Sequence, residues 1–182
     1  MDYRLKPPSY NIVRLTFFGI AAYLLFQTAL AGVVSEDWTQ WRGPNRDGQI
    51  ARSEWPNSLS HHSLKELWST DLAEGYASPV LTTDLVFSVE TRDKKEEVVR
   101  AFDRNTGEQQ WEFATSGAMK VPFYAARNGS WARSTPATDG DYLYVLSMLD
   151  VLTCLDVKTG KEIWQVDFKE RESTQKPPFG GV

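Results

Sequence analysis

Apolar and polar residues alternate in short runs between residues 77 and 168, and the runs form two sets of four. The first set is 77–81, 85–90, 97–103 and 109–114, and the second is 134–138, 142–147, 151–156 and 162–168. A period of two is typical of β-strands with one buried face. Turn residues separate the runs, and Asp139-Gly140 is a strong hairpin signal. The pattern therefore predicts two units of four short antiparallel strands.

An eleven-residue motif occurs once in each unit. It reads AFDRNTGEQQW from Ala101 to Trp111 and CLDVKTGKEIW from Cys154 to Trp164, and a third, partial copy, KELW, ends at Trp68. Four positions coincide at the same spacing: Asp103 and Asp156, Thr106 and Thr159, Gly107 and Gly160, and Trp111 and Trp164. Such a repeat indicates an array of similar units.

The motif combines turn residues with a large aromatic ring. In Asp-x-x-Thr-Gly the carboxylate accepts backbone hydrogen bonds across a tight turn, and glycine takes a positive φ. The tryptophan that follows can bury its ring against a neighbouring unit. We therefore expect Trp111 and Trp164 to be inter-unit anchors, and alanine at either to cost about 3–5 kcal/mol. The equivalent positions of Asp103 and Asp156 favour a structural role over paired-carboxylate chemistry. The alternative is two unrelated hairpins with a common turn.

Repeated four-stranded units are typical of β-propeller blades. We expect an all-β fold with an incomplete propeller, because closed propellers have about 4–8 blades and the sequence shows two. Residues 64–70 around Trp68 resemble the last strand of a further blade, whose other strands we expect to come from a segment absent here. The alternative is a two-blade protein that associates into a ring.

The repeats resemble those of pyrroloquinoline-quinone (PQQ) type β-propellers, whose blades carry the tryptophan-docking motif A-x-D-x-x-T-G-x-x-x-W. The segment 37–48, DWTQWRGPNRDG, resembles the opening of a bacterial secreted branch of that family. Together the resemblances cover roughly Asp37 to Val182. They imply a binding or assembly scaffold of the cell envelope, or alternatively the N-terminal part of a PQQ-dependent dehydrogenase-like oxidoreductase.

Residues 1–31 have the pattern of a secretory signal peptide. Basic residues precede a short apolar run at 15–26, and Ala29-Leu30-Ala31 is a small-residue cleavage site. The run is shorter than the roughly 20 residues of a membrane span. We expect cleavage after Ala31 and export to the periplasm or outside the cell. Membrane contact is then expected only through this segment, or through an uncleaved anchor as the alternative. Residues 32–63 form an N-terminal extension with the DWxQWRGP segment, and 64–182 a partial propeller.

Charge narrows the class of partner. The chain has a net charge of −4, and loss of three basic residues and one acidic residue with the signal peptide leaves −6. An acidic domain argues against nucleic acid or anionic lipid, so we expect a protein partner or further blades. The single cysteine, Cys154, is expected to be a buried, small hydrophobic residue without an intrachain disulfide.

No catalytic constellation emerges from the sequence. The resemblance implies that a dehydrogenase would need a Ca²⁺ site and a catalytic aspartate, and Ca²⁺ takes 6–8 oxygen ligands. Carboxylates here lie in turns and charged loops, so we expect no catalytic or metal residues and no evident cofactor; PQQ enters only through the resemblance. His61 and His62 are adjacent and would point to opposite sides of an extended chain, which favours an exposed loop over a metal site.

One segment, Lys120 to Arg127, is rich in aromatic and basic residues, and Trp131 and Arg133 lie beside it in the sequence. Loops at the rim of a rigid scaffold commonly carry binding function. The sequence therefore predicts a candidate binding loop, with inter-blade packing as the alternative. Its candidate residues are Phe123, Tyr124, Arg127, Trp131 and Arg133.

Overall fold

The computed structural model describes residues 37–50, 65–117, 122–124, 129 and 131–172. The chain divides into two units, 1–35 and 36–182, and every described residue belongs to the second. The expected signal peptide, His61, His62 and Arg127 lie outside the described residues.

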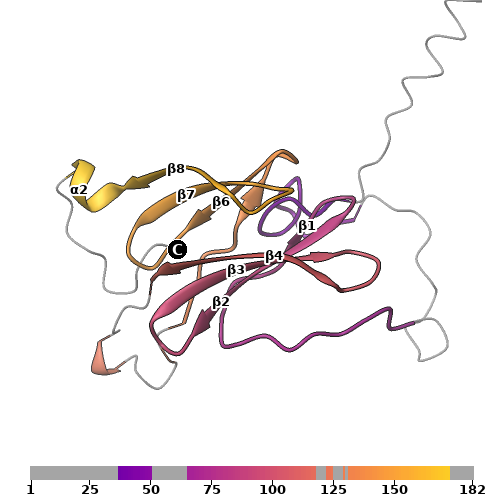
Figure 1. The fold of residues 1–182 in the computed structure, drawn as a ribbon, viewed down its shortest axis with the longest axis horizontal. Coiled ribbons are helices and arrows are strands. Elements are labelled where there is room, and N and C mark those ends of the chain that lie inside the picture. The colour runs from indigo at the N-terminus through magenta and orange to yellow at the C-terminus, as the bar shows by residue number, and fades with distance from the viewer. Residues whose placement is uncertain (1–36, 51–64, 118–121, 125–128, 130, 173–182) are drawn as a thin grey trace, which may run out of the picture. The chain divides into compact units, whose positions relative to one another are not determined.

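Two antiparallel four-stranded sheets make up the structure, which confirms the predicted all-β, incomplete propeller (Figure 1). The first blade contains β1 (Val80–Leu81), β2 (Leu85–Arg92), β3 (Glu96–Asp103) and β4 (Gln109–Ser116), in that order across the sheet. The second blade contains β5 (Ala137–Thr138), β6 (Tyr142–Leu146), β7 (Val151–Asp156) and β8 (Glu162–Asp167). A short helix, α2 (Phe168–Glu172), follows β8. No helix in the described ranges has the length and apolar content needed to cross a membrane.

The strand limits differ from the sequence pattern for local reasons. The first strand of each blade has only two residues instead of five, and in each case a proline, Pro79 or Pro136, precedes it and offers no N–H to a ladder. The hairpin between β2 and β3 is longer than expected. Its tight turn places Asp93 and Lys94 at φ of 53° and 56°, so the ladder continues to the Arg92–Glu96 pair.

Both blades share the same irregularity. The pairing shifts register between Ala101 and Phe102 in the first blade, and between Cys154 and Leu155 in the second. A bulge increases the local twist of a strand and redirects its side chains. The two bulges lie at the same motif position, so the repeat extends to the backbone geometry.

One hydrophobic core joins the two blades. We call the face of the first blade that contacts the second blade its forward face. The core contains residues of this face together with residues of the second blade: Val80, Phe87, Val89, Val99, Ala101 and Trp111, with Leu143, Val145, Leu155 and Val157. Because these residues form a single cluster, removal of either blade would expose the apolar face of the other.

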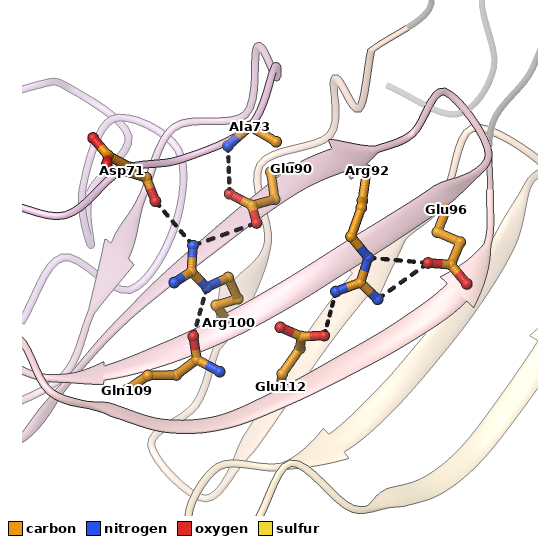
Figure 2. A network of polar contacts seen from close by, with 8 residues as sticks. All are labelled: Asp71, Ala73, Glu90, Arg92, Glu96, Arg100, Gln109 and Glu112. Carbon is orange, nitrogen blue, oxygen red and sulfur yellow. Dashed lines mark hydrogen bonds and ion pairs between the residues drawn. The ribbon is translucent and has the colours of Figure 1, made fainter.

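The opposite, rear face of the first blade carries polar side chains beside the buried Val98 and Phe102. Figure 2 shows Arg100 donating to the main-chain oxygen of Asp71 at 3.0 Å and to Gln109 at 2.8 Å. Glu90 accepts a hydrogen bond from the amide of Ala73 at 2.9 Å. The chain around residues 71–73 is therefore held on this face through polar contacts.

A second ionic group lies further along the rear face. The Arg92 guanidinium contacts Glu96 at 3.1 Å and Glu112 at 2.6 Å (Figure 2). These side chains are largely solvated, so the pairs contribute little to stability.

Two N-terminal segments lie against the blades without becoming strands of their sheets. Trp38 exchanges two main-chain hydrogen bonds of 2.9 Å with Leu81 at the free edge of β1, and Thr39 accepts one from Thr138 of β5 at 2.9 Å. This stretch therefore links the first strands of both blades and covers an edge that would otherwise be open. Residues 65–73, expected to include a strand, have no strand assignment.

Candidate inter-blade docking site

The Asp-x-x-Thr-Gly turns have the same geometry in both blades. The carboxylate of Asp103 accepts hydrogen bonds from the amides two and three residues on, at 2.9 and 2.8 Å, and from the Thr106 hydroxyl at 3.1 Å. The corresponding distances for Asp156 are 3.1, 2.8 and 2.7 Å, the last to the Thr159 hydroxyl. These aspartates therefore serve as turn caps.

The same hydrogen bonds stabilise the ionised form of each aspartate. The amide of Thr106 is the largest cause of the lowered pKa of Asp103, and the hydroxyl of Thr159 is the largest for Asp156. A carboxyl whose pKa is lowered on folding contributes stability above its unfolded pKa. That contribution is lost as the pH falls through the folded pKa.

We expect Asp156→Asn to destabilise the protein at neutral pH and to cost less stability at acidic pH, because the native carboxyl becomes protonated as the pH falls through its lowered pKa. The reason is that asparagine keeps an acceptor oxygen but not the charge. Urea unfolding midpoints at both pH values measure the difference. Asp84→Asn changes an exposed aspartate outside the motif and is the control. Its urea unfolding midpoint should match that of the native protein at both pH values. An equal loss at both pH values would contradict the role of the charge.

Each turn receives the indole of an upstream tryptophan on its glycine. Gly107 and Gly160 have φ of 73° and 67°. A methyl group at Gly107 would lie 2.5 Å from Cδ2 of Trp68, and one at Gly160 would lie 2.5 Å from Cδ2 of Trp111. Real carbon atoms do not approach so closely, so the absence of a side chain at glycine is what admits the ring.

A hydrogen bond fixes each indole on its turn. The Nε1 of Trp68 donates to the main-chain oxygen of Arg104 at 2.8 Å, and that of Trp111 donates to the main-chain oxygen of Val157 at 2.9 Å. Both acceptors directly follow the motif aspartate. Sequence reasoning missed them because a main-chain oxygen is present at every residue and leaves no compositional signal.

Trp164 has a different environment from Trp111. It is 40% exposed against 9% for Trp111, and its nearest aromatic ring is Tyr144, with centroids 6.2 Å apart. No Asp-x-x-Thr-Gly turn covers it in the part of the chain that the structure describes. The sequence predicts Trp164 as an inter-blade anchor, but no further blade meets its ring among the described residues, so that role stays a prediction.

The register shows that Trp164 belongs to an equivalent forward face on the second blade. Phe87, Ala101 and Trp111 are cross-strand neighbours in the first blade. The corresponding neighbours in the second blade are Tyr144, Cys154 and Trp164, with Leu152 and Val166 beside them. The second blade thus presents, on one face, positions equivalent to those that meet a neighbouring blade in the first.

Tyr144 adds a polar group to this face where the first blade has Phe87. Its hydroxyl donates to Asp139 at 2.8 Å, and this bond raises the pKa of Tyr144 to about 12. The amide of Tyr142, followed by that hydroxyl, lowers the pKa of Asp139. Cys154 is buried, and burial raises the pKa of its thiol. It is therefore a packing residue with little thiolate character.

The candidate binding loop divides into two groups. Phe123 and Tyr124 are 91% and 66% exposed and stack edge to face, with ring centroids 5.7 Å apart. Trp131 lies under the ammonium of Lys94 at 6.0 Å, and the Arg133 guanidinium lies over the Tyr76 ring at 5.0 Å.

The described ranges contain no group of three or more His, Cys, Asp or Glu side chains arranged to hold an ion.

Two four-stranded antiparallel sheets joined by tryptophan–glycine docking have the architecture of β-propeller blades, and they are similar to the repeats of PQQ-type propellers. Consistent with this, residues 94–180, just under half of the chain, match the family model described as outer membrane protein assembly factor BamB. No curated protein matches the sequence.

Two solved structures are similar in part. BamB from Moraxella catarrhalis is 21% identical with a TM-score of 0.32, and the match covers 46% of this chain and 20% of that one. Quinohemoprotein alcohol dehydrogenase from Comamonas testosteroni is 23% identical with a TM-score of 0.39, and the match covers 54% of this chain and 14% of that one. This chain therefore spans a fifth or less of either structure.

Proposed function

We propose that this chain is an exported, non-catalytic β-propeller protein that acts as a binding or assembly scaffold in the cell envelope. One observation carries the proposal. The forward face of the second blade repeats the positions, including the tryptophan, that meet a neighbouring blade in the first, yet that tryptophan, Trp164, is 40% exposed.

The two existing docks define what such a face binds. In both, an indole lies on a glycine at positive φ and donates to the carbonyl three residues before that glycine. The partner of Trp164 is therefore a protein turn of the Asp-x-x-Thr-Gly type, in a further propeller blade or in another envelope protein. The family match to an assembly factor supports a role in protein assembly.

Site-specific photocrosslinking tests the proposed surface. The full chain is produced with a photoreactive phenylalanine analogue at position 164, crosslinked in cells, and the joined peptide is identified by mass spectrometry. The expected peptide contains an Asp-x-x-Thr-Gly turn. The same analogue at Trp41, an exposed tryptophan outside the blades, is the control and should not give that peptide. Equal products from both positions, or a peptide without the turn, would count against the proposal.

Two further measurements address the remaining parts of the proposal. N-terminal sequencing of the protein from a fractionated envelope should begin at Gly32, and recovery of the uncleaved chain from the cytoplasm would argue against export. Addition of PQQ and Ca²⁺ should produce no dye-linked oxidation of alcohols or sugars. A quinone absorbance band together with such oxidation would overturn the non-catalytic assignment.

A further inference from the structure

Glu97 is a buried carboxylic acid at the contact between the two blades. It lies on β3 and is 2% exposed. Its Oε1 accepts a hydrogen bond of 2.9 Å from the amide of Met148, which is 1% exposed and lies in the turn between β6 and β7. A single side chain of the first blade thus binds the backbone of the second.

The surroundings leave little room for water at this carboxyl group. Its cross-strand neighbours are Thr91 on β2 and Thr115 on β4. A methyl group at Gly117 would lie 2.5 Å from Cγ of Glu97, so the backbone packs directly on the side chain. Burial raises the pKa of Glu97 to about 7, because it outweighs the opposite effect of the Met148 amide.

No described residue forms an ion pair with Glu97. Two charged residues in the adjacent segments are acidic and cannot neutralise a carboxylate. Asp150 lies in the turn that carries Met148, and Glu74 lies in the segment hydrogen-bonded to Thr91. Two cations of the flanking segments lie over aromatic rings: Arg133 over Tyr76, and Lys94 over Trp131. The Nε of Arg133 is buried and has no hydrogen-bond partner among the described residues. Glu96 faces Arg92 on the rear side of the sheet. The ionised carboxylate therefore has the Met148 amide as its described partner.

We propose that Glu97 is a proton-dependent latch between the two blades. With the carboxyl group protonated, the turn around Met148 closes over it and the inter-blade contact is dry. When the proton is lost to solvent, the buried charge has too few hydrogen-bond donors. The turn then opens so that water can hydrate the carboxylate. Contact between the blades is therefore tighter below neutral pH than above it.

Amide NMR on the full chain tests the latch. The Met148 amide shift should titrate with a midpoint near pH 7. Its protection against hydrogen exchange, corrected for the intrinsic rate, should fall about tenfold between about pH 6 and pH 8. Glu97→Gln is nearly isosteric and cannot ionise, so both changes should disappear. Glu96→Gln, which alters the adjacent exposed carboxylate, should preserve them.

A Met148 amide shift that stays flat between about pH 5.5 and 8.5 would overturn the latch, as would an undiminished titration in Glu97→Gln. If the Glu97→Gln chain does not fold, the titration of the native protein decides the question by itself. The latch does not depend on the proposed scaffold role, since it concerns only the contact between the two blades.

Discussion

Trp111→Ala should lower the free energy of unfolding by about 3–5 kcal/mol, the usual cost of removing a large buried aromatic side chain. The ring is 9% exposed, stacks with Phe87 at a centroid distance of 5.8 Å and covers Gly160. Its Nε1 also donates to the Val157 carbonyl at 2.9 Å. The substitution therefore removes apolar burial and leaves a buried acceptor without its donor. Denaturant unfolding followed by circular dichroism measures the loss.

Trp164→Ala is the matched control, because it removes the same side chain from the same motif position. Trp164 is 40% exposed and covers no described turn, so we expect a loss of less than about 2 kcal/mol. Similar losses at Trp111 and Trp164 would show that a further surface covers Trp164. A loss below about 1 kcal/mol at Trp111 would show that it does not anchor the blades.

Gly160→Ala should destabilise the protein by about 2–4 kcal/mol, from strain at a positive φ and from overpacking against the indole. The φ of Gly160 is 67°, and the new methyl group would lie 2.5 Å from Cδ2 of Trp111. The ring cannot stay on the turn without a shift of one blade. The same unfolding measurement quantifies the loss.

Two comparisons separate strain from contact. Gly140→Ala also introduces a side chain at positive φ, here 101°, but its methyl group would meet nothing within 4 Å, so it reports backbone strain alone. Gly160→Ala should also be made in the Trp111→Ala variant. There it should lower the free energy of unfolding by about 1–2 kcal/mol less than it does in the native protein. Strict additivity would mean that the ring and the glycine do not interact.

Much of the blade architecture could be predicted because its causes are local. Alternation defined the strands, and Asp103 and Asp156 with their threonines defined the turns through contacts within three residues. The errors also had local causes: prolines shortened β1 and β5, and two residues in the left-handed region lengthened the hairpin between β2 and β3. The candidate site was harder to predict, because identical motif residues acquire different surroundings.

The sequence by itself determined that this protein contains two four-stranded blades, with a docking tryptophan and a turn glycine in each motif. The alternation of apolar and polar residues and the choice of turn residues act over a few positions, so both can be read directly from the sequence. Only the tertiary structure decided which tryptophan meets which glycine, which ring stays exposed, and that Glu97 lies buried against Met148. These contacts join residues 36 to 51 positions apart, and they depend on how two sheets pack, which no local pattern encodes.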